Sequence, residues 1–434
     1  MNTKPDPGIN HRTYVTFLGT SKYLPVAYHW QGQPLATTPY AQEAELGGPL
    51  ATVAIDAVLV LGTATSRQMH WETPTGLCHR IKQLGHDPKF VEIPEELSPD
   101  AQWQTFELLL AHVGDRDHLI LDITHGFRAV PVVLSSALHF LRLTRNVYLE
   151  HVFYGAYDSK PPAIVDYRDF YAIHDWTEAV ARLVDEADAR RLAEVAAQSG
   201  GLPMAGLADP QVTDALQRLT AAVRNVDVQL VGTVAREALQ HIQAAELGAT
   251  GASKVLLRLV LDKFAALAAA EPISGRYDGD YFRVQFVLVG LLLEHGLNMQ
   301  AFTVMRELLC SLGLHVASGV VVRDLRGKDR HAKKARLRAD IFGSLLRIAP
   351  EAWKFADDNG PVVAELRPWY DRLDAAGLVS LLRPLSKEIQ DIRNGFDHAW
   401  TTAERSDVGA AGARLVAELA AVVEVLEQLP VPTP

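Results

Sequence analysis

Short apolar runs alternate with amphipathic stretches over residues 1–172. Five runs have this form: Tyr14–Leu18, Ala57–Leu61, Phe90–Ile93, His118–Asp122 and Val147–Phe153. Runs of this length that are bounded by turns and followed by helical spacing are typical of the buried strands of an α/β sheet. Between the first two runs, the segment Tyr23–Ala36 has strand-like residues on both sides of Gln31 and Gly32, which predicts an inserted hairpin.

Beyond residue 172 apolar residues recur at i, i+3, i+4 and i+7, the spacing of amphipathic helices. This spacing predicts helices at Asp175–Ala197, Val212–Leu247, Ser253–Ala270, Tyr281–Leu314, Arg336–Arg347 and Ala411–Leu429. A stretch rich in Gly and Pro at Ser199–Pro210 predicts a loop. The expected fold is an α/β Rossmann-like N-terminal domain followed by an all-α region.

Composition changes this picture little. The chain has 434 residues, with 42 Lys and Arg against 52 Asp and Glu and a net charge of −10, which fits a globular protein of two or three domains. Its two cysteines, Cys78 and Cys310, form no CxxC pair, which favours a reducing compartment and no structural zinc. No apolar stretch approaches the ~20 residues of a membrane span, and we expect a cytoplasmic protein that binds no membrane.

One basic segment departs from the acidic total. Arg323–Arg338 contains eight Lys and Arg and two Asp, a local charge of +6. A focused basic patch attracts a polyanion even on an acidic protein. A solvated basic loop explains the same residues equally well.

Familiar catalytic motifs are absent from the sequence. It has no GxxxxGK[ST], GxGxxG, HExxH or GxSxG. These absences weigh against nucleotide hydrolysis on a P-loop, dinucleotide redox chemistry, zinc proteolysis and serine hydrolysis. The remaining candidate chemistry lies at strand ends and near the C-terminus.

Small and hydroxyl residues follow the first two core strands. They are Gly19, Thr20, Ser21 and Lys22 after the first strand, and Gly62 and Thr63 after the second. In open α/β sheets ligands bind beyond the carboxyl ends of strands, where backbone N–H groups and helix N-termini suit phosphates. Tight turns with Ser and Thr helix caps are the alternative explanation.

The third strand end carries more candidate ligand-binding residues. The segment Asp122–Pro131 holds Thr124, His125, Gly126 and Arg128 just before a predicted helix. Packing does not call for an acid, a hydroxyl, an imidazole and a guanidinium within seven residues. This mixture predicts a ligand site, in which Arg128 and Lys22 supply positive charge.

A second group of polar residues lies near the C-terminus. Leu385, Ile389, Ile392, Phe396 and Trp400 predict an apolar helical stripe, and Asn394 and His398 then fall together on the opposite face, with Arg393 beside the stripe. An imidazole for proton transfer and a guanidinium for phosphate charge are what RNA cleavage without a metal requires. The motif is short, and chance matches occur in many chains.

Together these segments resemble a known family. The pairing of Leu18–Tyr23 (LGTSKY) and Asp122–Arg128 (DITHGFR) with Arg393–His398 (RNGFDH) is similar to the CARF–HEPN effector ribonucleases of type III CRISPR systems. The resemblance implies a CARF ligand-sensing domain at 1–172, a helical linker at 173–280 and a HEPN ribonuclease domain at 281–434. The linker matches nothing beyond helix.

The family resemblance also implies ligands and partners. The CARF domains of a homodimer or higher even oligomer form one pocket for a cyclic oligoadenylate, with cyclic tetra-adenylate preferred, and binding activates cleavage of single-stranded RNA. No DNA partner and no cofactor or metal are expected. The strand-end residues carry over as ligand-binding: Gly19, Thr20, Ser21, Lys22, Gly62, Thr63, Thr124, His125, Gly126 and Arg128.

For the nuclease, the resemblance implies that Arg393, Asn394 and His398 are catalytic. His398 positions or deprotonates the 2′-hydroxyl, Arg393 stabilises the phosphorane and Asn394 orients them. Alternatives remain open. One alternative is a CARF-type sensor or scaffold without nuclease activity. Another is a nuclease that cleaves its own ring ligand in the CARF pocket, and a third is a different nucleotide-binding enzyme that acts at Asp122–Arg128.

Overall fold

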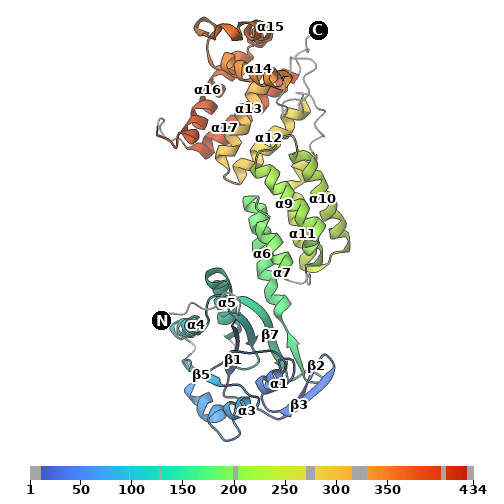
Figure 1. Cartoon of the computed structure of the whole chain (residues 1–434), viewed down its shortest axis with the longest axis vertical. Helices are drawn as coiled ribbons and strands as arrows, with labels where there is room; N and C mark the ends of the chain where they lie inside the picture. The colour runs from blue at the N-terminus through green and yellow to red at the C-terminus, as the bar shows by residue number, and fades with distance from the viewer. Residues whose placement is uncertain are drawn as a thin grey trace. The chain divides into compact units, whose positions relative to one another are not determined.

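The structure is a computed structural model, which describes residues 11–96, 98–126, 130–198, 204–269, 279–314, 330–401 and 407–427. The chain divides into two compact units, which we call unit 1 (Met1–Ile173) and unit 2 (His174–Pro434). Unit 1 is α/β and unit 2 is helical (Figure 1). An α/β domain followed by helices, as the hydrophobic pattern predicts, is confirmed.

Unit 1 is built on an eight-stranded sheet in the order β3-β2-β8-β7-β6-β1-β4-β5. Its strands are β1 (Arg12–Leu18), β2 (Val26–Trp30), β3 (Gln33–Thr38), β4 (Ala57–Gly62), β5 (Pro88–Glu92), β6 (His118–Asp122), β7 (Tyr148–Ala156) and β8 (Ala163–Asp166). The five strands β5-β4-β1-β6-β7 are mutually parallel. They are the five apolar runs of the sequence.

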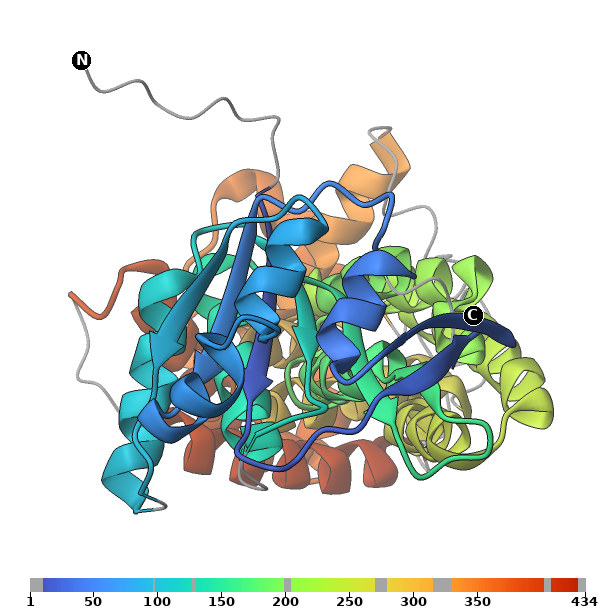
Figure 2. The ribbon, with the colours of Figure 1, turned by 90° about the horizontal axis from the view of Figure 1, so that it is seen from below.

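Helices cover both faces of this sheet, because alternate residues of each strand point to opposite sides. Val15 and Phe17 join the core under α4 (Pro99–His112) and α5 (Val130–Arg145). Tyr14 and Val58 join the core under α1 (Ala41–Gly47) and α3 (Leu77–Gln83). A sheet buried on both faces accounts for the continuous apolar runs, and both views show its helices (Figures 1 and 2).

The predicted hairpin is present and extends the sheet. β2 and β3 are antiparallel, and their turn places Gln31 and Gly32 at positive φ. β2 also pairs in parallel with β8, a four-residue strand that the hydrophobic pattern did not predict. After β4 the chain forms α2 (Ala64–Ser66) and then a π-helical turn at Arg67–Trp71, a form that is frequent near functional sites.

The helices that follow the sheet are α6 (Arg168–Glu186), α7 (Arg190–Gln198), α8 (Ala205–Ala208), α9 (Pro210–Arg224), α10 (Val231–Gly248), α11 (Gly251–Ala269), α12 (Gly279–Glu294), α13 (Asn298–Ser311), α14 (Arg330–Arg347), α15 (Gly360–Ala375), α16 (Leu378–Asp397) and α17 (Val408–Glu427). Within unit 2, α10 packs between α9 and α11. Helix α13 contacts α12, α14, α16 and α17, so the C-terminal helices share one core.

Three expected helices are each two helices in the structure. The breaks contain residues at positive φ: Ala187, Val226 and Gly296. At the first break Asp188 accepts a hydrogen bond from the backbone N–H of Arg190 and starts α7. Apolar spacing continues across such breaks, because both helices bury one face, and periodicity alone therefore misses them.

Two further expectations need correction. The predicted loop Ser199–Pro210 contains the short helix α8. Of the basic segment Arg323–Arg338, residues 323–329 lie outside the described residues, and the rest begins α14 rather than a loop. In the described part of the chain, no helix is both long and apolar enough to cross a membrane.

Candidate functional site

The strand order of unit 1 marks one edge of the sheet as a ligand site. In chain order the five parallel core strands are arranged 3-2-1-4-5, so successive connections run in opposite directions from β1. Such sheets open a crevice at the carboxyl ends of the strands where the order reverses. Here that point lies between β1 and β6.

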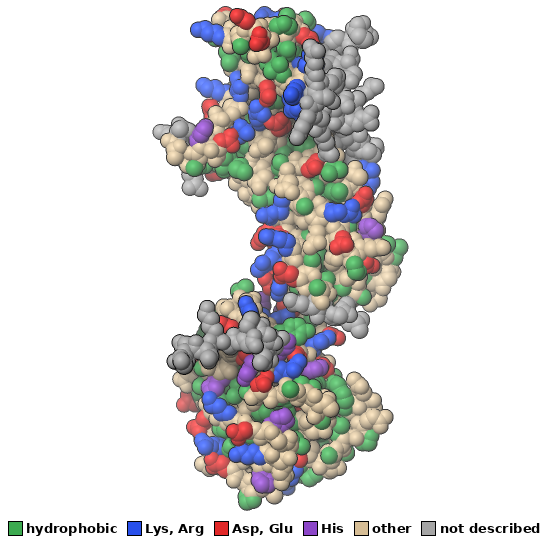
Figure 3. Space-filling view, in the orientation of Figure 1, with side chains coloured by type: hydrophobic (Ala, Val, Ile, Leu, Met, Phe, Trp, Pro, Cys, Tyr) green, Lys and Arg blue, Asp and Glu red, His purple; other side chains and the backbone are tan. Residues whose placement is uncertain are grey.

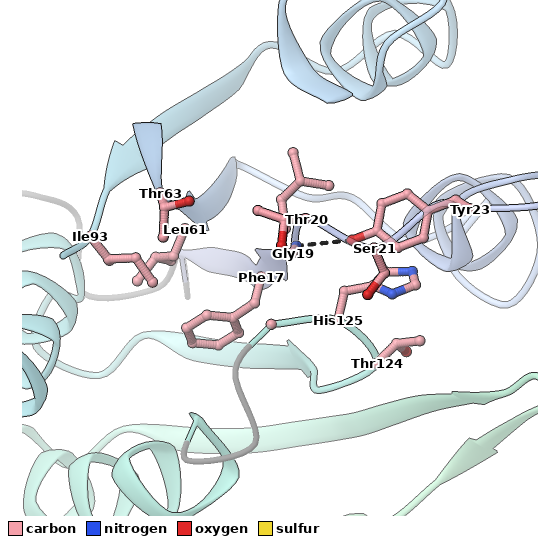
Figure 4. Close-up of a pocket in the computed structure, with 12 residues that line it drawn as sticks. Phe17, Gly19, Thr20, Ser21, Tyr23, Leu61, Thr63, Ile93, Thr124 and His125 are labelled. Carbon is pink, nitrogen blue, oxygen red and sulfur yellow. Dashed lines mark hydrogen bonds between the residues drawn. The ribbon is translucent and has the colours of Figure 1, made fainter. Parts of the chain in front are cut away.

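A cavity of about 280 Å³ lies at this point. Its lining comes from the ends of four strands: Phe17 and Leu18 in β1 with Gly19, Thr20, Ser21 and Tyr23 after it, Leu61 and Thr63 at the end of β4, Ile93 after β5, and Thr124, His125 and Gly126 after β6. Figure 4 shows these side chains around the space. Residues separated by a hundred positions in sequence thus meet at one cavity.

The structure brings most of the predicted ligand residues together here. Gly19, Thr20, Ser21, Thr63, Thr124, His125 and Gly126 line the cavity. Lys22 is exposed and Gly62 is buried, and neither lines it. Arg128 lies outside the described residues.

The glycines at the strand ends have different structural roles. A Cβ on Gly19 would lie 3.3 Å from the backbone nitrogen of Gly126, so the loops after β1 and β6 touch at that point. A Cβ on Gly62 would lie 2.5 Å from Ser66 Oγ and 2.9 Å from the ring of Phe90. Packing alone therefore explains the glycine at position 62.

Thr63 also has a structural role, since it caps α2. Its Oγ1 accepts a hydrogen bond from the Ser66 backbone N–H at 3.2 Å. Its side chain lines the cavity as well, so capping and ligand contact are compatible at this position.

Tyr23 is a cavity residue that sequence reasoning did not select. Its hydroxyl accepts a hydrogen bond from the backbone N–H of Gly19 at 2.9 Å (Figure 4). Its ring lies 4.3 Å from the imidazole of His125 and 4.5 Å from that of His70, centroid to centroid. In the sequence, the feature that could have indicated Tyr23 was an aromatic residue four positions after a strand-end glycine. No sequence feature indicated His70, which lies in the π-helical turn.

Burial determines the charge of these imidazoles. It lowers the pKa of His125 to about 4, with a smaller contribution from nearby His70. Burial also lowers the pKa of His70, and a hydrogen bond with the Ser21 backbone partly opposes this effect. The cavity therefore presents neutral imidazole at pH 7, which leaves positive charge to residues outside its lining.

A buried carboxylate holds the loop after β6. Asp122 Oδ1 accepts hydrogen bonds from the backbone N–H and the hydroxyl of Thr124, and Oδ2 accepts one from Thr16 Oγ1 at 2.6 Å. Thr124 Oγ1 in turn accepts the N–H of Gly155 on β7. Asp122 thus holds the loop that forms this cavity wall and does not itself line the cavity.

A second carboxyl lies beside it. Glu45 of α1 is fully buried, as is Asp122, and Glu45 Oε2 accepts a hydrogen bond from Tyr14 at 2.6 Å. Burial first and the charge of Asp122 second raise the pKa of Glu45 well above its ordinary value. Burial also raises the pKa of Asp122, against the hydrogen bonds from Thr124 and Thr16. We therefore assign the proton of this pair to Glu45.

The second predicted site lies at the end of α16 in unit 2. The helix ends at Asp397, and His398 is its C-cap, still bonded through its backbone N–H to the Asn394 carbonyl at 2.9 Å. The prediction that His398 and Trp400 continue the helix is wrong. Ala399 and Trp400 adopt positive φ, and the chain turns back so that the Trp400 ring lies on Gly395.

This turn leaves His398 exposed and Arg393 half-buried. Arg393 Nη1 forms an ion pair with Asp397 Oδ2 at 2.9 Å, one turn along the same helix. The guanidinium proposed for phosphate thus carries a carboxylate partner, an acid that lies inside the motif and that sequence reasoning passed over.

Asn394 is held by Gln390 of the same helix, which is itself held by a residue of another helix. Its Oδ1 accepts a hydrogen bond from Gln390 Nε2 at 2.6 Å, and Gln390 Oε1 accepts one from Arg347 Nη1 of α14 at 2.6 Å. Gln390 lies one helical turn before Asn394, and this spacing in the sequence could have predicted their contact. Arg347 was not foreseeable, because it comes from another helix.

The surface of unit 2 carries charges of both signs. The visible face of unit 2 intersperses Lys and Arg with Asp and Glu (Figure 3). Arg338, in the basic segment, pairs with Glu365 at 2.8 Å, and Arg414 pairs with Glu388 at 2.5 Å. Among the described residues no three His, Cys, Asp or Glu side chains are grouped so as to hold a metal ion.

Comparison with known proteins finds a limited likeness. No protein-family model matches the chain. A stretch of 88 residues is 34% identical to the CRISPR-associated protein MJ1674 of Methanocaldococcus jannaschii. That stretch is 18% of this chain and 14% of the relative, so the chain spans a small part of the relative's length.

Proposed function

We propose that this protein is a CRISPR-associated endoribonuclease in which a cyclic oligoadenylate, cyclic tetra-adenylate in preference, binds unit 1 and activates RNA cleavage in unit 2. The observation that carries the proposal is the presence in one chain of two sites. One is a cavity at the reversal point of a parallel sheet, and the other is an Arg-x4-His motif at a helix end. The partial similarity to MJ1674 supports a CRISPR-related role.

The cavity supports a nucleotide ligand. Its volume of about 280 Å³ is near the low end of small-molecule sites, roughly 300 Å³, and suits one nucleotide. Main-chain groups at Gly126 and the hydroxyls of Thr20 and Ser21 suit phosphate and ribose. A ring of several nucleotides then requires the same patch from a second chain, as a closed two-fold dimer provides.

The helix end supports RNA cleavage without a metal. In this proposal the 2′-hydroxyl attacks the adjacent phosphorus and forms the new O–P bond, while the bond to the 5′-oxygen breaks. The departing 5′-oxygen takes up a proton from the solvent to match the one lost from the 2′-hydroxyl, so the products are a 2′,3′-cyclic phosphate and a 5′-hydroxyl and the atoms balance. His398 takes or positions the proton of the 2′-hydroxyl, and Arg393 stabilises the charge on the phosphorane. Asn394 orients the phosphate.

Ribonuclease activity is tested by cleavage of a fluorescent single-stranded RNA in EDTA, without activator and with cyclic tri-, tetra- or hexa-adenylate. We expect cleavage with cyclic tetra-adenylate, and its loss in His398→Ala. His79→Ala is the matched control, because His79 is an exposed histidine of α3 that lines no part of the cavity. The proposal is overturned if the wild type cleaves no RNA with any of the rings, or if His398→Ala cleaves RNA as fast as the wild type.

A further inference from the structure

Three side chains form a hydrogen-bonded relay that ends at the proposed nuclease site. Arg347, near the end of α14, donates to Gln390 Oε1 at 2.6 Å and to Ser344 Oγ at 3.1 Å. Gln390 of α16 donates through Nε2 to Asn394 Oδ1 at 2.6 Å. All three relay residues, Arg347, Gln390 and Asn394, are partly buried.

The chemistry of the first residue fixes the direction of the whole relay. A guanidinium has donors only, so the Gln390 atom that faces Arg347 is the amide oxygen. The Gln390 atom that faces Asn394 is then the NH₂ group, and Asn394 meets it with its own oxygen. The amide orientations, which are otherwise ambiguous, follow from this order.

The relay leaves Asn394 with one defined role. Its oxygen is engaged by Gln390, so the group left for a ligand is its NH₂, with two N–H donors. Asn394 lies beside Arg393 and one helical turn before His398, whose backbone N–H bonds the Asn394 carbonyl. An asparagine that presents donors complements phosphate oxygens, whereas the opposite amide orientation would present an oxygen to them and repel them.

We propose that Arg347 and Gln390 are positioning residues that set Asn394 as a hydrogen-bond donor to a phosphate oxygen of the RNA, an inference that rests on the proposed ribonuclease function. Neither residue touches the RNA in this scheme. Their effect passes through the orientation of one amide group.

Two substitutions at Gln390 separate this role from simple packing. In Gln390→Glu the carboxylate still accepts from Arg347 but cannot donate, so Asn394 turns its NH₂ toward it and presents oxygen to the phosphate. In Gln390→Met a similar volume remains and Asn394 rotates freely. We expect kcat to fall about 100-fold in Gln390→Glu, the effect of losing one oriented donor, and about 10-fold in Gln390→Met.

Arg347 provides an independent test of direction. Arg347→Lys keeps a donor-only group and should stay within about threefold of the wild-type kcat. In Arg347→Glu the new carboxylate accepts a hydrogen bond from the Gln390 NH₂ group, which reverses the amide orientations of both Gln390 and Asn394. The fall in kcat should therefore match that of Gln390→Glu. Gln217→Glu, the same change at an exposed position of α9, is the control for added negative charge. Equal kcat in Gln390→Glu and Gln390→Met overturns the inference.

A second measurement does not depend on catalysis. The side-chain ¹H–¹⁵N resonances of Asn394, identified by their loss in Asn394→Asp, should shift in Gln390→Glu and in Arg347→Glu and stay in place in Arg347→Lys. Unshifted resonances in all variants overturn the relay even where cleavage falls. Shifted resonances in a protein that cleaves no RNA with any activator instead overturn the proposed function, and the donor role toward RNA with it.

Discussion

The indole ring of Trp400 lies on the backbone of Gly395, so close that a Cβ at position 395 would meet the ring at 2.5 Å. The ring reaches this position through two residues at positive φ, Ala399 and Trp400, and it also contacts Phe396 edge-on at 5.3 Å. His398 lies inside this reversal. The glycine of the RNGFDH motif therefore determines the shape of the turn that carries the proposed catalytic imidazole.

Gly395→Ala should lower both stability and RNA cleavage. Replacing a helical glycine normally stabilises by about 1 kcal/mol, but the overpacking against Trp400 costs about 1–3 kcal/mol. The control is Gly290→Ala in α12, where a Cβ meets nothing within 4 Å and a rise in melting temperature is expected. Thermal unfolding and cleavage rates check both. A Gly395→Ala protein as stable and active as wild type contradicts this role.

Asp397→Asn should strengthen RNA binding. It removes the carboxylate that pairs with Arg393 at 2.9 Å and frees the guanidinium for phosphate. The pair is half-exposed, so its loss should cost no more than about 1 kcal/mol of stability. Asp371→Asn, which breaks the similar i,i+4 pair with Arg367 in α15, is the control. The measurement is the RNA dissociation constant at fixed salt, and an unchanged or weaker value for Asp397→Asn would show that the ion pair does not compete with RNA.

Glu45→Gln should change how stability depends on pH. The folded-state pKa of Glu45 is raised, so the unfolded chain loses this proton first as pH rises above about 4.5, and folding stability falls through that range. Glutamine keeps the hydrogen bonds of a protonated carboxyl but has no proton to lose, so this fall in stability with pH disappears. The melting temperature of the variant relative to wild type should therefore rise from pH 4 to pH 8. Glu107→Gln, on an exposed position of α4, should show no such trend.

His125→Gln should change the pH dependence of stability in the opposite direction, because the stability contribution of His125 is lost as pH falls. Burial lowers the folded-state pKa of His125 to about 4. Between pH 6.5 and pH 4 this imidazole is therefore protonated in the unfolded chain but stays neutral in the folded chain. Wild-type stability is lost as pH falls through this window, and the variant should lose less. Chemical unfolding at pH 7.5 and pH 4.5 checks this, with His79→Gln as the exposed control. Parallel losses in wild type and His125→Gln would contradict the buried environment.

The sheet was predictable because five strands buried on both faces leave uninterrupted apolar runs. β8 was not, since Ala163–Asp166 is short and one of its two partners, β2, lies far away in sequence. The helix breaks at Ala187 and Val226 were missed because neither residue is a type that favours positive φ. A turn at such a residue depends on packing, which periodicity does not report.

The candidate sites divide in a similar way. Residues next to a strand end, such as Thr124 and His125, were predictable because the strand determines where the loop emerges. Contacts between separate elements were not, and these include His70 against Tyr23 and Arg347 against Gln390. The end of α16 before His398 was also not predictable, because the Trp400 reversal packs against Gly395, the third residue of the motif, and no helix-breaking residue stands at the helix end.

In the proposed function, the size of the strand-end cavity predicts how many chains bind one ring. About 280 Å³ accommodates one nucleotide, so a closed two-fold dimer would hold one nucleotide of a cyclic tetra-adenylate in each of its two cavities. A calorimetric titration should then reach its end point at half an equivalent of ring per chain, whereas a linear mononucleotide that binds the same cavity should reach it at one. The ratio of these two end points gives the number of chains that share each ring.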